Sequence, residues 1–153
     1  NAYIRVEGFA GSVAYRMGKL MTALAGFGSV DQMDHASELW WDIRDVRAFH
    51  ERQGDVWRVS VKPSDAPALV ANLKADDLLF DWGGGLVWVL MPEGRDLRGQ
   101  MKVPGHATLV RASAETRSVL EQFQPQVAPL AAISQGLRDR FDPRGILNPG
   151  LMG

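Results

Sequence analysis

The sequence predicts an α+β fold: one mainly antiparallel sheet with helices packed on one of its faces. Stretches in which apolar and polar residues alternate, as in half-buried strands, recur between stretches of helical periodicity. Gly83–Gly85 separates two apolar runs and indicates a hairpin, because glycine readily adopts the positive φ angles of a tight turn. From Asp55 onward the expected order is β-α-β-β-α-β, the ferredoxin-like split arrangement.

The first part of the chain is expected to add a β-α-β-α extension to this unit. Ile4 and Val6 alternate with polar residues and predict a strand over 2–8. Ser12 is the expected N-cap of a helix that the glycines at 26–28 end. A short strand over 30–33 and a helix from Asp34 or Ser37 to about His50 follow.

From Asp55 the pattern predicts alternating strands and helices of a single domain, residues 1–153. Pro129 is expected to start the last helix. The expected strands are 55–62, 78–82, 86–91 and 106–111, and the expected helices are 66–74, a weak one at 95–102, 114–123 (helical or irregular) and 129–140.

The segment from Asp142 to Gly150 predicts a stop for that last helix. Asp142-Pro143 disfavours helical backbone, and Gly145 supplies a turn. Two interpretations remain open, an ordinary docked C-terminus or a segment shaped to meet a partner or a second domain.

Composition limits the classes of function. Hydrophobic residues make up 46% of the chain and charged residues 23%, as in globular proteins, and the net charge of −1 argues against binding nucleic acid by phosphate neutralisation. We expect no membrane span and no signal peptide. The abrupt strand-like start suggests a chain cut from a longer one. Without cysteine, this chain cannot supply disulfides, iron–sulfur ligands or a thiol nucleophile.

The second face of the sheet is expected to be polar. A solvated face is the simplest interpretation. However, the strand containing Trp88 is apolar on both sides, which predicts cover on both faces. The residues expected on this face are Arg5, Glu7, Arg58, Ser60, Lys62, Asp81 and either His106 with Thr108 or the alternate set of that strand.

Other motifs are weak. No helix or Gly-Lys-Ser/Thr follows Gly83–Gly85, so this turn is not a phosphate loop. His35, His50 and His106 lack metal-ligand spacing, and we predict no metal.

Several stretches of the chain form a joint pattern: Ile4–Gly8 with Gly11–Val13, Trp41–Val46, Trp57–Val61, Asp81–Trp88, Gly105–Ala112 and Phe141–Gly150. Together they resemble the C-terminal half of the FAD-binding subunits of glycolate oxidases, which are FAD-linked oxidases of the vanillyl-alcohol oxidase type. The resemblance covers essentially the whole chain, and its C-terminal pattern is shared by the wider oxidase family.

The resemblance implies a cap domain that covers the substrate side of FAD while glycolate is oxidised to glyoxylate. FAD would be held mainly by an N-terminal domain that this chain lacks, so the isolated fragment is expected to bind FAD weakly or not at all and to be inactive. The implied partners are that domain, a second flavin subunit and an iron–sulfur subunit. The location would be cytoplasmic, or the inner membrane face through the complex.

A small 2-hydroxy acid needs its carboxylate held and its hydroxyl proton accepted. With the family in view, Arg58 is the first candidate for the carboxylate clamp and Arg5 the second, because guanidinium binds both carboxylate oxygens. His106 is the candidate base, and Asp81 would orient it or merely cap the hairpin.

Asn148 and Trp88 are the predicted contacts to the flavin side. Asn148 lies in the C-terminal segment. This segment resembles the stretch of chain that, in the family, returns from the cap towards the flavin domain.

Two alternatives remain open. The FAD-binding chain of such a complex could relay electrons or serve as a structural partner, with glycolate reacting elsewhere. The chain could also be a stand-alone ferredoxin-like binding or regulatory module without catalysis.

Overall fold

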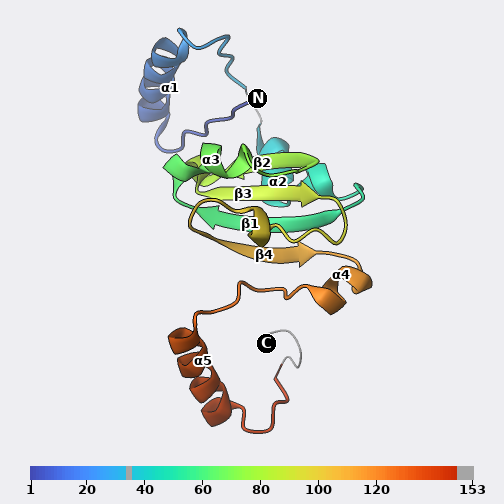
Figure 1. Cartoon of the computed structure of the whole chain (residues 1–153). Coiled ribbons are helices and arrows are strands. Elements are labelled where there is room, and N and C mark those ends of the chain that lie inside the picture. The colour runs from blue at the N-terminus through green and yellow to red at the C-terminus, as the bar shows by residue number, and fades with distance from the viewer. Residues whose placement is uncertain (34–35, 148–153) are drawn as a thin grey trace. The chain divides into compact units, whose positions relative to one another are not determined.

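The computed structural model describes residues 1–33 and 36–147 (Figure 1). Three residues named above lie outside the described residues: Asp34, a predicted helix cap, His35, and Asn148, a predicted cofactor contact. The chain forms two compact units, Asn1–Trp41 and Asp42–Gly153, which are described separately.

The first unit contains helix α1 (Ala10–Leu24) and the start of helix α2 (Ser37–Arg44). Both helices were predicted, but α1 has Phe9 and not Ser12 as its N-cap, and α2 ends at Arg44 and not near His50. The strands expected over 2–8 and 30–33 are not formed, and Ile4 is 56% exposed. Alternation shows that a segment could be half-buried, whereas a strand also needs a neighbour to pair its backbone groups. The four strands of the described sheet all come from later in the chain.

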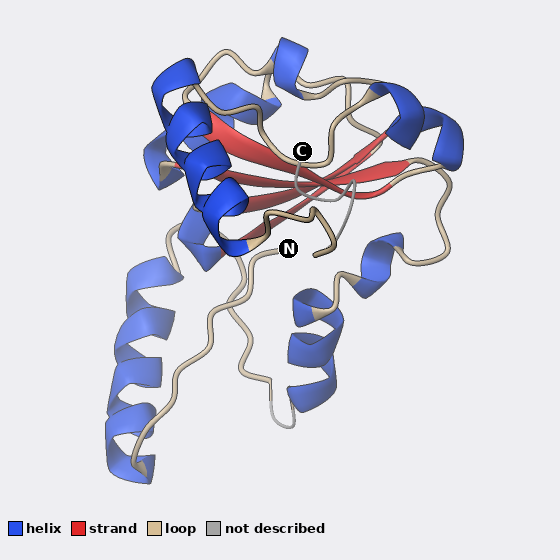
Figure 2. Ribbon diagram, turned by 90° about the horizontal axis from the view of Figure 1, so that it is seen from below, coloured by secondary structure: helices blue, strands red, loops and turns tan. Residues whose placement is uncertain are grey.

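The second unit is built on a four-stranded sheet, seen in Figures 1 and 2. Its order is β2-β3-β1-β4 and all neighbouring strands are antiparallel, which confirms the α+β class. The crossover from β1 through helix α3 (Ala66–Val70) to β2 is split, because β3 lies between those two strands. The strands are β1 (Asp55–Val61), β2 (Asp77–Asp81), β3 (Leu86–Met91) and β4 (Gly105–Arg111).

Some connections between the strands contain less helix than the sequence pattern suggests. The weak helix expected over 95–102 is a single 3-10 turn at Arg98–Gln100. Further 3-10 turns lie at Arg47–Phe49, Pro63–Asp65 and Trp82–Gly84. The last helices are α4 (Ala114–Val119) and α5 (Ala128–Phe141), and no described residue of α5 is buried.

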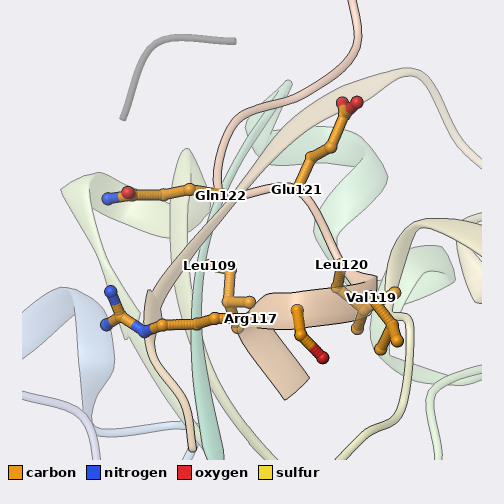
Figure 3. Close-up of a pocket in the computed structure, with 7 residues that line it drawn as sticks. Leu109, Arg117, Val119, Leu120, Glu121 and Gln122 are labelled. Atoms are coloured by element: carbon orange, nitrogen blue, oxygen red, sulfur yellow. The ribbon is translucent and has the colours of Figure 1, made fainter. Parts of the chain in front are cut away.

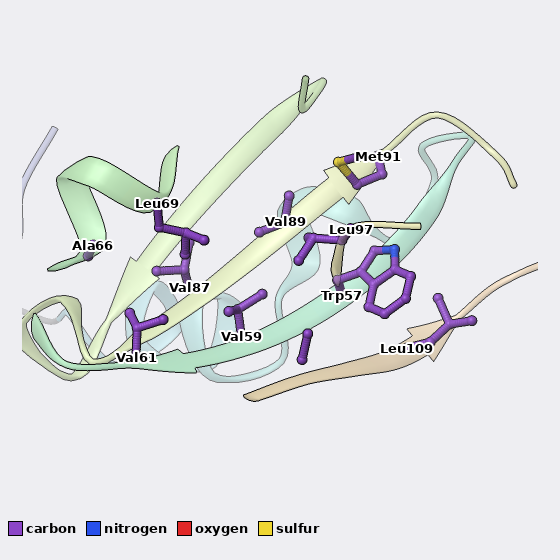
Figure 4. Close-up of a cluster of buried hydrophobic side chains, with 11 residues drawn as sticks. Trp57, Val59, Val61, Ala66, Leu69, Val87, Val89, Met91, Leu97 and Leu109 are labelled. Atoms are coloured by element: carbon purple, nitrogen blue, oxygen red, sulfur yellow. The ribbon is translucent and has the colours of Figure 1, made fainter. Parts of the chain in front are cut away.

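The main hydrophobic core lies on the first face of the sheet, against α3 and the segment around Leu97 (Figure 4). Trp57 is fully buried there, near Leu97 and Leu109. The core consists of Trp57, Val59, Val61, Ala66, Leu69, Val87, Val89, Met91, Leu97, Ala107 and Leu109.

A smaller cluster lies on the second face, at one end of the sheet. Val46 and Phe49 pack there against Val56 of β1 and Leu90 of β3. The helical turn at 47–49 therefore lies on the face opposite α3. Together the two clusters explain why β3 is apolar on both sides, since each face of this strand has apolar neighbours.

Arg111 of β4 holds the segment that leads into β1. Its guanidinium donates to the carbonyl oxygens of Phe49 at 2.6 Å, His50 at 3.1 Å, Arg52 at 2.7 Å and Gly54 at 3.3 Å. A fork of several N–H donors suits such a cluster of backbone acceptors. This arginine is therefore occupied by the fold and is not available to hold a substrate.

Asp142 ends α5 at Phe141, as the sequence predicts. Its carboxylate accepts from the amides of Ile146 at 3.0 Å and Leu147 at 2.8 Å. The Gly145 amide donates to the Asp142 carbonyl at 3.0 Å, and Gly145 has a φ of 62°. These residues thus form a hydrogen-bonded turn in which Gly145 takes the turn position that the sequence predicts.

We expect this turn to open in acid. The backbone donors of Leu147 and Ile146 lower the pKa of Asp142 below its ordinary value. The carboxylate therefore stabilises the turn above the ordinary aspartate pKa of about 3.9, and this contribution is lost as the pH falls through the lowered value. Amide NMR shifts of Ile146 and Leu147 should titrate together, with a midpoint below about 3.9. An unchanged titration in Asp142→Ala would exclude this carboxylate as the cause.

Candidate functional site

The second face of the sheet brings the main predicted site residues together. Residues directly opposite each other in an antiparallel pair lie on one face. Arg58 of β1 is opposite Trp88 of β3 and Thr108 of β4. One row further along, Ser60 is opposite His106. The register therefore selects the His106/Thr108 set and places it on the same face as Arg58.

The Arg58 side chain contacts Trp82, which directly follows β2. The guanidinium carbon lies 5.4 Å from the centroid of the Trp82 ring, within cation–π range. Because β3 lies between β1 and β2, the Arg58 and Trp82 side chains together span β3. Arg58 is half-buried, and none of the ion pairs in the described part of the chain involves it. Its N–H donors are therefore available to an anion.

Asp81 caps the hairpin turn and does not orient His106. Its Oδ1 atom accepts from the Trp82 amide at 2.7 Å. Asp81 is on β2 and His106 is on β4, the two opposite edges of the sheet. Three strand spacings of about 4.8 Å put roughly 14 Å between them, too far for a hydrogen bond. Of the two roles that the sequence left open, the structure shows the cap.

His106 is exposed near the start of β4. It is a diagonal neighbour of Arg58 on the same face, and such positions lie about 7–8 Å apart along the sheet. A small hydroxy acid bound between the two would have its carboxylate at Arg58, whose guanidinium lies beside the Trp82 ring, and its hydroxyl towards His106.

Arg5 is not in a strand of the described sheet. The strand that was expected to carry it is not formed, and its guanidinium makes an ion pair with Glu7. It also lies 5.8 Å from the centroid of the Trp40 ring, in the same unit. The prediction that Arg5 joins Arg58 depended on a strand over 2–8, so the structure offers no support for it.

Two pockets of the described chain lie away from this face. One, of about 310 Å³, is beside α4, where Arg117, Leu120 and Gln122 contribute to its lining (Figure 3). Another, of about 430 Å³, lies at the C-terminal end of α5 and includes Asp142. Neither contains Arg58 or a residue directly opposite it in the sheet. On the candidate face, Ser60 and His106 are exposed and Arg58 is half-buried.

Trp82 is the functional candidate that the sequence pattern did not single out. The available signal was its position, between an aspartate that can cap a turn and three glycines. A large aromatic residue at a hairpin turn has little core to enter, and Trp82 is indeed 64% exposed. Only the structure shows that the ring meets Arg58.

Metal-binding clusters and membrane-spanning helices are both absent from the described residues. These residues contain no group of three or more His, Cys, Asp or Glu side chains arranged to hold a metal ion. In the same part of the chain, no helix has the length and apolar character needed to cross a membrane.

The fold and the face together define an α+β protein with a polar and aromatic sheet surface. No family model and no solved structure matches this chain. This chain does match a curated protein. The glycolate oxidase subunit GlcE of Escherichia coli (strain K12) is 35% identical to it over 98% of this chain. The chain spans 38% of the length of that relative. The resemblance to the FAD-binding subunit of glycolate oxidase, predicted from the motifs, is confirmed.

Proposed function

We propose that this chain is the cap of an FAD-dependent glycolate oxidase subunit and covers the substrate side of the flavin while glycolate is oxidised to glyoxylate. One observation carries the proposal: in a chain 35% identical to a glycolate oxidase subunit, the register places Arg58 and His106 on one open sheet face. A sheet face with exposed polar residues suits a surface that closes a site against another domain. The sheet would be a ferredoxin-like unit, in agreement with its split crossover.

FAD fits this face only in part. Half-buried Trp88 and exposed Trp82 offer aromatic surface suited to the edge of a flavin ring. The glycine turn after Asp81 leads directly into β3 and not into a helix, so it offers no helix N-terminus to a diphosphate. The rest of the cofactor would be held outside this chain. When bound, the flavin would supply the acceptor for the hydride of the substrate.

The residues of this chain would position glycolate and take its proton. The guanidinium of Arg58 would bind both carboxylate oxygens through its fork of donors. A neutral His106 would accept the hydroxyl proton at a ring nitrogen, leaving that nitrogen protonated. Trp88, opposite Arg58, would exclude water from one side of the bound acid.

The proposed partners are an N-terminal FAD-binding domain of the same protein, a second flavin subunit and an iron–sulfur subunit. Because this chain contains no cysteine, the iron–sulfur ligands would come from elsewhere. We place the complex in the cytoplasm or at the inner membrane face.

Deleting this segment from the full-length protein tests the proposal. We expect the truncated protein to retain FAD but to lose flavin reduction by glycolate, because the carboxylate clamp and the base are gone. Anaerobic mixing with glycolate, followed by flavin absorbance, measures the rate, and FAD released on denaturation measures retention. The companion variant His106→Gln should retain FAD and reduce it about 10²–10⁴-fold more slowly.

Equal rates of flavin reduction with and without this segment would favour the other interpretation, a binding or regulatory module that takes no part in the chemistry. A truncated protein without FAD would show instead that the segment is needed to hold the cofactor, and His106→Gln would then decide the catalytic question alone.

A further inference from the structure

The backbone of Trp82 adopts an unusual conformation. Its φ angle is 51°, and only two non-glycine residues in the described part of the chain, Val46 and Trp82, have positive φ. Bulky residues rarely adopt this region because the Cβ atom crowds the backbone. Glycine would fit here without strain, and three glycines follow immediately. Such an outlier at an exposed position motivates a search for a function of the ring itself.

The surrounding turn holds this conformation. Asp81 Oδ1 accepts from the Trp82 amide at 2.7 Å, and the Gly85 amide donates to the Trp82 carbonyl at 3.2 Å. The turn also lies close to the corner after β1: a Cβ atom added at Gly84 or Gly85 would lie 3.5 Å from the Pro63 carbonyl oxygen and 3.6 Å from the Pro63 Cγ atom, respectively. Tertiary contacts thus fix the direction in which the Trp82 side chain leaves the hairpin.

The ring is directed to Arg58. The distance of 5.4 Å from the guanidinium carbon to the ring centroid allows an attraction between the cation and the ring face. An aromatic face attracts a guanidinium without being a carboxylate, so this contact does not supply the acceptor that the N–H fork binds best. A carboxylate partner for Arg58 would have used those donors, but the described ion pairs leave this arginine out.

We propose that Trp82 is a positioning residue that holds the Arg58 guanidinium over the open sheet face for the carboxylate of the substrate. This inference rests on the proposed function, in which Arg58 is the clamp. The ring restricts a long flexible side chain before substrate arrives, and this lowers the conformational entropy lost on binding. Trp82 itself exchanges no proton or electron with the substrate.

The test uses the full-length protein with its partner subunits and four variants: Trp82→Asn, Trp82→Phe, Arg58→Ala and the double variant Arg58→Ala/Trp82→Asn. Asparagine tolerates positive φ, so Trp82→Asn removes the ring while retaining the turn. We expect its KM for glycolate to rise about tenfold, its kcat to change less and its thermal stability to stay equal or increase. Trp82→Phe retains an aromatic face and should recover most of the affinity.

The double variant shows whether Trp82 affects glycolate binding through Arg58 or independently of it. If Trp82 acts only by placing Arg58, replacing Trp82 should not change the KM for glycolate further in a protein that already carries Arg58→Ala. Phe80→Leu is the matched control, since Phe80 is an exposed aromatic of β2 on the opposite face, and it should leave KM unchanged.

The outcomes distinguish two failures. If Arg58→Ala turns over glycolate normally, the clamp and this inference both fail. If Arg58→Ala is impaired while Trp82→Asn matches the unmodified protein, or if the two effects multiply in the double variant, Trp82 does not position Arg58 and the proposed function stands.

Discussion

Replacing Arg58 with alanine in the full-length protein is expected to lower kcat/KM for glycolate by tens- to several-hundredfold. Losing a charged contact to the substrate that persists in the transition state costs about 2–4 kcal/mol, and each 1.4 kcal/mol is about tenfold in rate. Because Arg58 is half-buried and has no ion pair among the described residues, the loss should come from the substrate and not from unfolding. Steady-state turnover with glycolate measures it.

Arg58→Lys separates charge from shape. A lysine retains the positive charge but lacks the planar fork, so it should recover only part of the lost activity. Arg95→Ala, in an exposed loop, is the matched control for removing a surface arginine and should behave as the unmodified protein. Normal kcat/KM in Arg58→Ala would exclude Arg58 as the clamp and would direct attention to sites outside this sheet face.

Replacing Trp57 with alanine should have the largest effect on stability, about 3–5 kcal/mol of unfolding free energy. The Trp57 side chain is 0% exposed at the centre of the main core, and Figure 4 shows it among core side chains from other elements. Removal of its ring leaves a cavity in a close-packed interior. The Arg98 guanidinium, 4.8 Å from the ring centroid, also loses its aromatic partner.

Denaturant unfolding of the purified chain tests this. Trp41→Ala is the control, because that tryptophan is 55% exposed, and its loss should change the unfolding free energy by about 0.5 kcal/mol or less. Trp57→Phe should cost less than Trp57→Ala, since it keeps most of the packing and removes a buried Nε1 donor without a partner in the described structure. Equal unfolding free energies for Trp57→Ala and Trp41→Ala would contradict the placement of the core.

Arg98 shows why Trp57 is coupled to more than the sheet. The Arg98 guanidinium donates to the carbonyls of Ala107 at 3.1 Å, Glu121 at 2.9 Å and Gln122 at 3.0 Å. Partial burial lowers the pKa of Arg98, although arginine stays protonated in proteins. The side chain that stacks on Trp57 thereby ties β4 to the segment after α4.

The strands with the clearest alternation were predicted closely. The expected strand over 86–91 is β3 as observed, and the strand expected over 55–62 is β1, one residue shorter. The strand over 2–8 was wrong despite a similar pattern, because alternation shows amphipathicity but not the presence of a hydrogen-bonding partner. The weak helix over 95–102 was likewise reduced to one turn at Arg98–Gln100.

The sequence by itself determined the local features of this protein: strand periodicity, the glycine turn, the helix stop at Asp142 and the motifs shared with a glycolate oxidase subunit. Only the tertiary structure decided which residues share a face. A shift of one residue in register turns every side chain of a strand to the other face, and the β1–β4 pairing contains an irregularity between Val56 and Trp57. Strand order then separated Asp81 from His106, and the fold of the hairpin brought Trp82 to Arg58. These relations depend on contacts between distant segments, which local periodicity does not encode.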